Sequence, residues 1–137
     1  MPDHERADAH IRVGVDIVEV RRIERLLAEV PEIVETIFTG RELAYCSGRR
    51  KRAEHLAVRF AGKEAVLKAL GCALGGAARW TDIEIVNEVT GRPRVHLHGA
   101  LLARAEQNGL ADMDISLSHS AQLGIAQVVA LTDKLRA

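Results

Sequence analysis

The sequence predicts an α+β fold, in which a small antiparallel sheet packs against one long helix and several shorter ones. Helical and strand patterns are interleaved along a chain of 137 residues, 47% of them hydrophobic, which is enough for one domain with a real core. Residues 52–71 are a proline-free run of good helix formers that ends on a glycine. We expect residues 11–137 to form this domain, and residues 1–10, which are polar and aperiodic, to form a flexible tail.

Composition argues against several kinds of function. Lys plus Arg equals Asp plus Glu, at 19 each, so no overall charge attracts nucleic acid or membrane. Aromatic residues make up only 3% of the chain, which leaves few stacking platforms for single-stranded nucleic acid. Cys46 and Cys72 lack the paired spacing of a zinc site, and no apolar run approaches the length of a membrane span. We expect a reduced, cytoplasmic protein that binds neither nucleic acid nor membrane.

A first strand is expected over residues 11–20. It should have one well-buried face, because β-branched residues occupy alternate positions there: Val13, Val15 and Ile17. Asp16 lies in the middle of this strand. An ionised carboxylate among apolar residues needs a cation or several donors, so Asp16 is either a metal ligand or the partner of a buried arginine or a capping amide.

Helices are expected directly after this strand. Residues 19–30 repeat apolar side chains at helical spacing, and their other face carries three basic residues that suit either solvent or an acidic partner: Arg21, Arg22 and Arg25. A short helical segment should cover residues 31–38, and Thr39 with Glu42 forms a capping box for the next helix. The basic run at residues 49–52 indicates an exposed loop or an anion-binding patch.

The long helix brings three functional groups onto one face. Phe60, Glu64 and Lys68 follow one another at positions i, i+4 and i+8. In most helices such an acid and base form only a solvated ion pair. Here a glycine-rich loop, residues 71–76, follows the helix, and in such a loop the backbone can come close to a ligand.

The last part of the chain predicts strands. Residues 82–89 and 94–97 should form a hairpin, and residues 98–108 a helix. Residues 112–118 alternate apolar and polar side chains and should pair with residues 124–131, whose nearly continuous apolar character predicts a buried strand.

These features together indicate phosphate chemistry with a divalent cation. Two carboxylates form a ligand set that Mg²⁺ tolerates, because this ion keeps several waters and takes its other oxygens from substrate phosphates. Lys68 would neutralise the same phosphates. Hydroxyls and an imidazole in the turn between the late strands could hold another phosphate: Ser118, His119 and Ser120.

Three segments resemble those of the holo-acyl-carrier-protein synthases, the small 4'-phosphopantetheinyl transferases: GVDIVEVRRI at 14–23, RFAGKEAVLKALG at 59–71 and SLSHS at 116–120. The resemblance covers nearly all of residues 13–131. It implies that a serine of apo acyl carrier protein attacks the β-phosphate of coenzyme A, as in fatty acid biosynthesis, so that phosphopantetheine is transferred and adenosine 3',5'-bisphosphate leaves. It also implies a phosphopantetheinyl transferase-like fold and a homotrimer with active sites at subunit boundaries.

The resemblance also implies roles for individual residues. Asp16 and Glu64 match the Mg²⁺ ligands, and with Lys68, beside the pyrophosphate, they form the catalytic set. Nucleotide contacts are expected from seven residues: Arg59, Lys68, Gly71, Pro93, Ser118, His119 and Ser120. The carrier protein should dock on Arg22, with Arg21 and Arg25 beside it. The general base stays open among Lys63, Glu64 and a water on Mg²⁺.

Two departures and two alternatives accompany this interpretation. Glu29 stands where some relatives carry a basic residue, which leaves the choice of carrier open, and Gly62 stands where many have alanine. The chain could instead serve polyketide or other secondary-metabolic carriers. In a different class, it could be a nucleotide-binding module without catalysis, although the joint presence of Asp16, Glu64 and Lys68 argues against that.

Overall fold

The computed structural model describes residues 9–133, and its elements follow the predicted order. They are β1 (Ala9–Glu19), α1 (Val20–Glu29), the short 3-10 helix η1 (Pro31–Ile33), α2 (Val34–Ile37), α3 (Gly40–Ser47), α4 (Arg52–Leu70), the 3-10 helix η2 (Trp80–Asp82), β2 (Ile83–Asn87), β3 (Pro93–Leu97), α5 (Gly99–Gln107), β4 (Leu110–His119) and β5 (Leu123–Asp133). The first strand therefore begins within the predicted tail, and the rest of that tail lies outside the described residues.

The predicted helix ends are confirmed where local chemistry determines them. Thr39 accepts a hydrogen bond from the Glu42 backbone N–H, and the Glu42 side chain accepts one from the Thr39 backbone N–H, which completes the capping box of α3. Helix α4 ends at Gly71, whose φ of 64° is a left-handed conformation that glycine adopts without steric cost. The α+β class is likewise confirmed.

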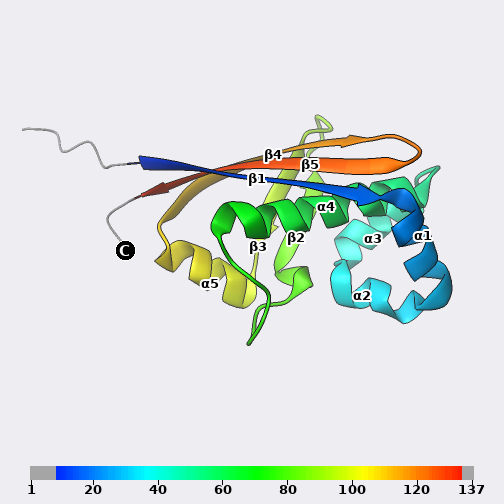
Figure 1. Cartoon of the computed structure of the whole chain (residues 1–137), viewed down its shortest axis with the longest axis horizontal. Helices are drawn as coiled ribbons and strands as arrows, with labels where there is room; N and C mark the ends of the chain where they lie inside the picture. The colour runs from blue at the N-terminus through cyan, green and yellow to red at the C-terminus, as the bar shows by residue number, and fades with distance from the viewer. Residues whose placement is uncertain (1–8, 134–137) are drawn as a thin grey trace, which may run out of the picture.

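The strands form two antiparallel sheets. β1, β5 and β4 lie side by side in that order, with β1 paired to β5 along its whole length, and β2 and β3 form the predicted hairpin. The first and last strands of the chain are thus neighbours, a pairing that the sequence patterns did not indicate. Figure 1 shows the helices on one side of the three-stranded sheet, with α4 running beneath it, α1 to α3 at one end and α5 at the other.

Helix α4 packs unusually close to the three-stranded sheet. A Cβ added to Gly14 on β1 would lie 2.0 Å from the carbonyl oxygen of Ala65, and one added to Gly124 on β5 would lie 2.8 Å from the backbone nitrogen of Val58. Only glycine fits where backbone meets backbone. The close approach places Asp16, two residues after Gly14, beside the helix.

The burial of β1 and β5 differs from what the sequence predicted for each strand. Val13, Val15 and Ile17 are 54–60% exposed, and the buried face of β1 is the opposite one, with Gly14 and Val18. Strand β5 is buried on alternate residues only. Its other residues leave a second apolar row on the open face: Leu123, Ile125, Val129 and Leu131. Because α4 lies so close, the sheet turns its small residues toward the helix and its bulky ones outward.

Packing also explains why position 62 is a glycine. A Cβ at this position would lie 2.4 Å from Cδ1 of Ile85, so alanine would require that buried side chain to move. Overpacking of this kind typically costs about 1–3 kcal/mol, more than the roughly 1 kcal/mol of helix propensity that alanine would add. The glycine therefore suits this core.

Two further features bear on the predicted setting of the protein. Cys46 and Cys72 are both free thiols, and Cys46 is fully buried. Over residues 9–133, no helix combines the length and apolar character that crossing a membrane would need.

Candidate functional site

The structure brings Asp16 on β1 to Lys68 on α4. The Lys68 ammonium nitrogen lies 3.0 Å from Oδ1 of Asp16 and also donates to the carbonyl oxygen of Val15, at 2.9 Å. Glu64 lies one helical turn before Lys68, on the same face. Burial raises the pKa of Glu64, and the nearby charge of Asp16 raises it further, whereas Lys68 and Arg22 lower it. Asp16 thus converges with two charged residues of α4, Glu64 and Lys68, that lie about 50 positions further along the chain.

The donor set fits a divalent cation with oxygen ligands. Two neighbouring carboxylates repel each other, as the raised pKa of Glu64 indicates, and a cation between them would relieve that repulsion. Within residues 9–133, no three His, Cys, Asp or Glu side chains gather as a metal cage. A site with two carboxylates, open on its remaining sides, matches the predicted Mg²⁺ chemistry better than it matches zinc.

A groove borders this acidic site. It has a volume of about 400 Å³ and is lined by the three predicted residues Glu64, Lys68 and Gly71, together with Cys72, Leu74 and Trp80. The Trp80 ring packs on Phe60, with ring centroids 5.2 Å apart, and the guanidinium carbon of Arg22 lies 5.4 Å from the Phe60 centroid. Arg22 therefore lies near the acidic site, and with Arg21 and Arg25 it lines a separate pocket where β1 meets α1.

A second pocket gathers other predicted residues. Arg59, Pro93 and His119 line a volume of about 520 Å³, with Tyr45, His55, Asn87 and Asp114 among the other lining residues. Arg59 is only 2% exposed. Its guanidinium stacks over the Tyr45 ring, 4.4 Å from the centroid, and donates to Oδ1 of Asn87 at 2.8 Å. A buried cation in an open pocket suits an anionic ligand.

Two histidines stand together in this pocket. The rings of His55 and His119 have centroids 5.0 Å apart, and Nδ1 of His119 lies 3.1 Å from Oε1 of Glu54. Burial lowers the pKa of His55, and the neighbouring charges of His119 and Arg59 lower it further. His55 precedes Arg59 by one helical turn, so helical spacing could have indicated it. Nothing local could have indicated Glu54 as the partner of His119.

The three residues of the Ser-His-Ser segment, at positions 118–120, have different surroundings in the structure. His119 pairs with Gly124 and turns toward α4, whereas Ser118 pairs with Ile125 and so belongs to the open face of the sheet. Ser120 accepts hydrogen bonds from the backbone of Gln122 and Leu123, each at 3.2 Å, and closes the turn between β4 and β5. Within one chain, only His119 of the three lines the pocket.

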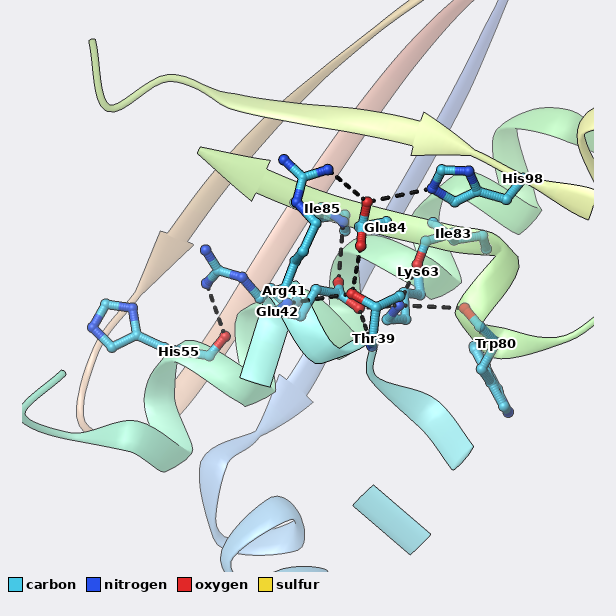
Figure 2. Close-up of polar contacts among 11 residues, drawn as sticks. Thr39, Arg41, Glu42, His55, Lys63, Trp80, Ile83, Glu84, Ile85 and His98 are labelled. Atoms are coloured by element: carbon cyan, nitrogen blue, oxygen red, sulfur yellow. Dashed lines mark hydrogen bonds and ion pairs between the residues drawn. The ribbon is translucent and has the colours of Figure 1, made fainter. Parts of the chain in front are cut away.

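Lys63 is built into the core and faces away from both pockets. It is 0% exposed, and its ammonium nitrogen lies 2.7 Å from Oε1 of the equally buried Glu42. It also donates to the carbonyl oxygens of Trp80 and Ile83. Figure 2 shows this group between α3, α4 and β2, where the other Glu42 oxygen accepts from the Ile85 backbone at 3.0 Å. A lysine enclosed in this way cannot reach a substrate, which removes it from the candidate bases.

The two pockets are separate within one chain. The groove beside Glu64 and the pocket around Arg59 share no lining residue. Of the seven predicted nucleotide residues, Lys68 and Gly71 thus lie in the groove and Arg59, Pro93 and His119 in the pocket, whereas Ser118 and Ser120 line neither. The structure gathers the predicted site residues into two groups.

Comparison with known proteins places this geometry in a family. The model of the 4'-phosphopantetheinyl transferase superfamily matches residues 12–126. A relative from Moorella thermoacetica, a holo-[acyl-carrier-protein] synthase, is 45% identical over 109 residues, which cover 80% of this chain and 84% of the relative.

Solved structures agree with this match. The holo-[acyl-carrier-protein] synthase of Neisseria meningitidis superposes with a TM-score of 0.79 at 33% identity, covering 87% of this chain and 96% of the other. A complex of the Chronobacterium ammoniagenes synthase with coenzyme A gives a TM-score of 0.77 at 27% identity, covering 91% and 98%.

The buried ion pair generates a prediction about stability. Lys63→Met should lower the free energy of unfolding by about 3–5 kcal/mol, because it leaves the Glu42 carboxylate buried and unpaired. Adding Glu42→Gln should recover a large part of this loss, since the amide oxygen can still accept a backbone hydrogen bond. Urea unfolding, followed by the fluorescence of the single tryptophan, measures both.

Lys51→Met provides the control, because Lys51 is largely exposed and its ion pair with Glu54 is long, at 3.8 Å, which indicates little stabilisation. A Lys63→Met protein as stable as the wild type, or a double variant no more stable than the single one, would contradict this account.

Proposed function

The chain belongs to the 4'-phosphopantetheinyl transferase superfamily, and we infer that it transfers the 4'-phosphopantetheine arm of coenzyme A to a serine of apo acyl carrier protein. In this reaction the serine oxygen bonds to the β-phosphorus of coenzyme A, the bond from that phosphorus to the bridging oxygen breaks, and adenosine 3',5'-bisphosphate leaves. The convergence of Asp16, Glu64 and Lys68 beside one groove is the structural observation that best supports this activity.

Asp16 and Glu64 are the residues that would hold Mg²⁺. The bound ion would stabilise the negative charge that grows on the diphosphate as the bond breaks. Lys68 lies where its ammonium group can donate to the same phosphates, because its side chain is about half exposed and already turned to Asp16. Because Lys63 is enclosed in the core, the candidates that remain for the base accepting the serine proton are Glu64 and a water on Mg²⁺.

A homotrimer, or another assembly of several copies, would explain two features. The open face of the three-stranded sheet carries apolar rows from β1 and β5, and Ile11, Val13 and Val129 on it are 72%, 60% and 44% exposed. Such a contiguous apolar face is typical of a subunit interface. Assembly would also let the groove of one copy and the pocket of another hold the two ends of one coenzyme A molecule.

The basic face of α1 is the proposed docking site for the acidic carrier protein. Arg21, Arg22 and Arg25 line one pocket, and Arg22 reaches toward the acidic site over Phe60. This arrangement would bring the carrier serine close to the metal. The free thiols suit a cytoplasmic enzyme, and fatty acid biosynthesis is the expected setting. Polyketide carriers remain the alternative substrate, which a mass-shift assay on a panel of purified apo carriers would decide.

Removing either carboxylate should abolish transfer. Asp16→Ala or Glu64→Ala should lower kcat at least about 100-fold, because a single carboxylate holds the cation poorly. Mass spectrometry of the carrier measures transfer, electron paramagnetic resonance of added Mn²⁺ measures metal binding, and circular dichroism checks the fold. Glu24→Ala, which removes an exposed acid on α1, is the control. A wild-type rate in either variant would remove the assignment.

Reversing one charge on α1 should weaken the binding of the carrier protein much more than the binding of coenzyme A. Arg22→Glu should raise the KM for apo carrier about tenfold or more, and raise the KM for coenzyme A far less, because the carrier is acidic. Steady-state kinetics with each substrate varied in turn gives both constants. Arg94→Glu makes the same reversal on β3 and should leave the carrier KM unchanged. Equal effects of Arg22→Glu on both substrates would argue against docking.

Charge on the open sheet face should prevent assembly. Val13 and Val129 are cross-strand partners on this face, so Val13→Lys combined with Val129→Lys should yield monomers that retain the fold but transfer poorly. Sedimentation velocity gives the mass of each species. A wild-type protein that is monomeric and fully active would disprove the shared-site proposal.

A further inference from the structure

The pocket around Arg59 contains a carboxylate and an imidazole held together from two distant elements. Glu54 lies in the first turn of α4, and His119 is the last residue of β4. Their contact of 3.1 Å joins Oε1 of Glu54 to Nδ1 of His119. The Glu54 side chain is 8% exposed and that of His119 is 36% exposed, so the acid lies behind the imidazole and the imidazole borders the pocket.

This contact determines which ring nitrogen a ligand can use. Nδ1 of His119 donates to the Glu54 carboxylate, which leaves Nε2 as the nitrogen available to a bound molecule. A carboxylate held against one nitrogen fixes the orientation of the ring, so Nε2 is the nitrogen that can donate to a bound anion when the ring carries both protons. Glu54 also lies 3.8 Å from Lys51, a longer contact with a largely exposed partner.

The charge in the rest of the pocket favours the binding of an anion. Arg59 donates to the carbonyl oxygen of His55 at 3.2 Å and to Oδ1 of Asn87, and both acceptors are neutral. Its Nε is buried without a hydrogen-bond partner. Among residues 9–133 no acid forms an ion pair with Arg59, so its charge is buried without compensation. A phosphate oxygen bound between Arg59 and His119 would supply both the charge and the acceptor.

We propose that Glu54 is a positioning residue, which orients His119 to bind the 3'-phosphate of coenzyme A beside Arg59, where the family resemblance already implies contacts to the nucleotide. The proposal rests on the inferred transferase function. Coenzyme A offers two kinds of phosphate, a diphosphate and a terminal phosphomonoester. The proposed function assigns the diphosphate to Asp16, Glu64 and Lys68, whose groove shares no lining residue with this pocket. The phosphomonoester is therefore the group left for this pocket, where the family resemblance implies nucleotide contacts.

The test compares coenzyme A with dephospho-coenzyme A, which lacks only the 3'-phosphate. Glu54→Gln keeps the size of the side chain and removes its charge. It should raise the KM for coenzyme A about tenfold, the effect expected for one charge-assisted hydrogen bond, while kcat and the KM for dephospho-coenzyme A stay within about twofold. His119→Gln should raise the KM for coenzyme A at least as much.

The effects of Glu54→Gln and His119→Gln on the KM for coenzyme A should not be additive. If Glu54 acts through His119, the Glu54→Gln and His119→Gln double variant should match His119→Gln alone, whereas independent roles would multiply the two effects. The chain offers a matched control in Glu84, which is also buried and also contacts a histidine, Nε2 of His98 at 3.3 Å, outside this pocket. Glu84→Gln should leave both KM values unchanged.

The possible results test the role of Glu54 separately from the proposed transferase function, on which it rests. A wild-type protein that transfers nothing from coenzyme A would overturn both. A wild-type protein that prefers coenzyme A, together with a Glu54→Gln variant that keeps the same preference, would overturn the role of Glu54 alone. An equal rise in KM for both substrates would show that Glu54 only supports the fold, and would also reject the proposal.

Discussion

The buried ion pair between Lys63 and Glu42 is the constraint on which the arrangement of the other elements depends. Both side chains are 0% exposed, and burying two charges is tolerable only when every polar atom finds a partner. Lys63 supplies three donors, to Glu42 and to the carbonyl oxygens of Trp80 and Ile83. Glu42 accepts in addition from the backbone of Thr39 and Ile85. The pair is satisfied only when α3, α4, η2 and β2 are assembled together.

The division of α4 into faces follows from this constraint. Successive residues on a helix point about 100° apart, so a helix that turns Lys63 inward must present Glu64 in a different direction. Lys63 points to α3 and β2, and Glu64 and Lys68 point toward the site. The sheet side of the helix is held by the close contact at Gly14. The rotation of α4 is thus restrained from two sides. The position of Glu64 is therefore determined by the contacts of Lys63 and Gly14.

The sequence predicted the features that short-range chemistry determines. The capping box at Thr39, the end of α4 at Gly71 and the hairpin of β2 and β3 each depend on a few adjacent residues, and all three were found. The errors concern long-range packing. Alternation identifies two faces of a strand, but which face is covered depends on what packs against it, and α4 selects the small residues of β1 and β5. Likewise, Glu54 and His119 are 65 positions apart, and only the fold shows that they touch.

Strand β1 links the proposed site to the proposed assembly. Asp16 belongs to the face that meets α4, and its neighbours Val15 and Ile17 belong to the open apolar face, because side chains alternate along a strand. A partner copy packed on those neighbours would hold the backbone that carries Asp16. A shift of one residue in the pairing of β1 with β5 would exchange the two faces, moving the carboxylate into the interface and the valines against the helix. The proposed assembly and the proposed metal site therefore require the same register.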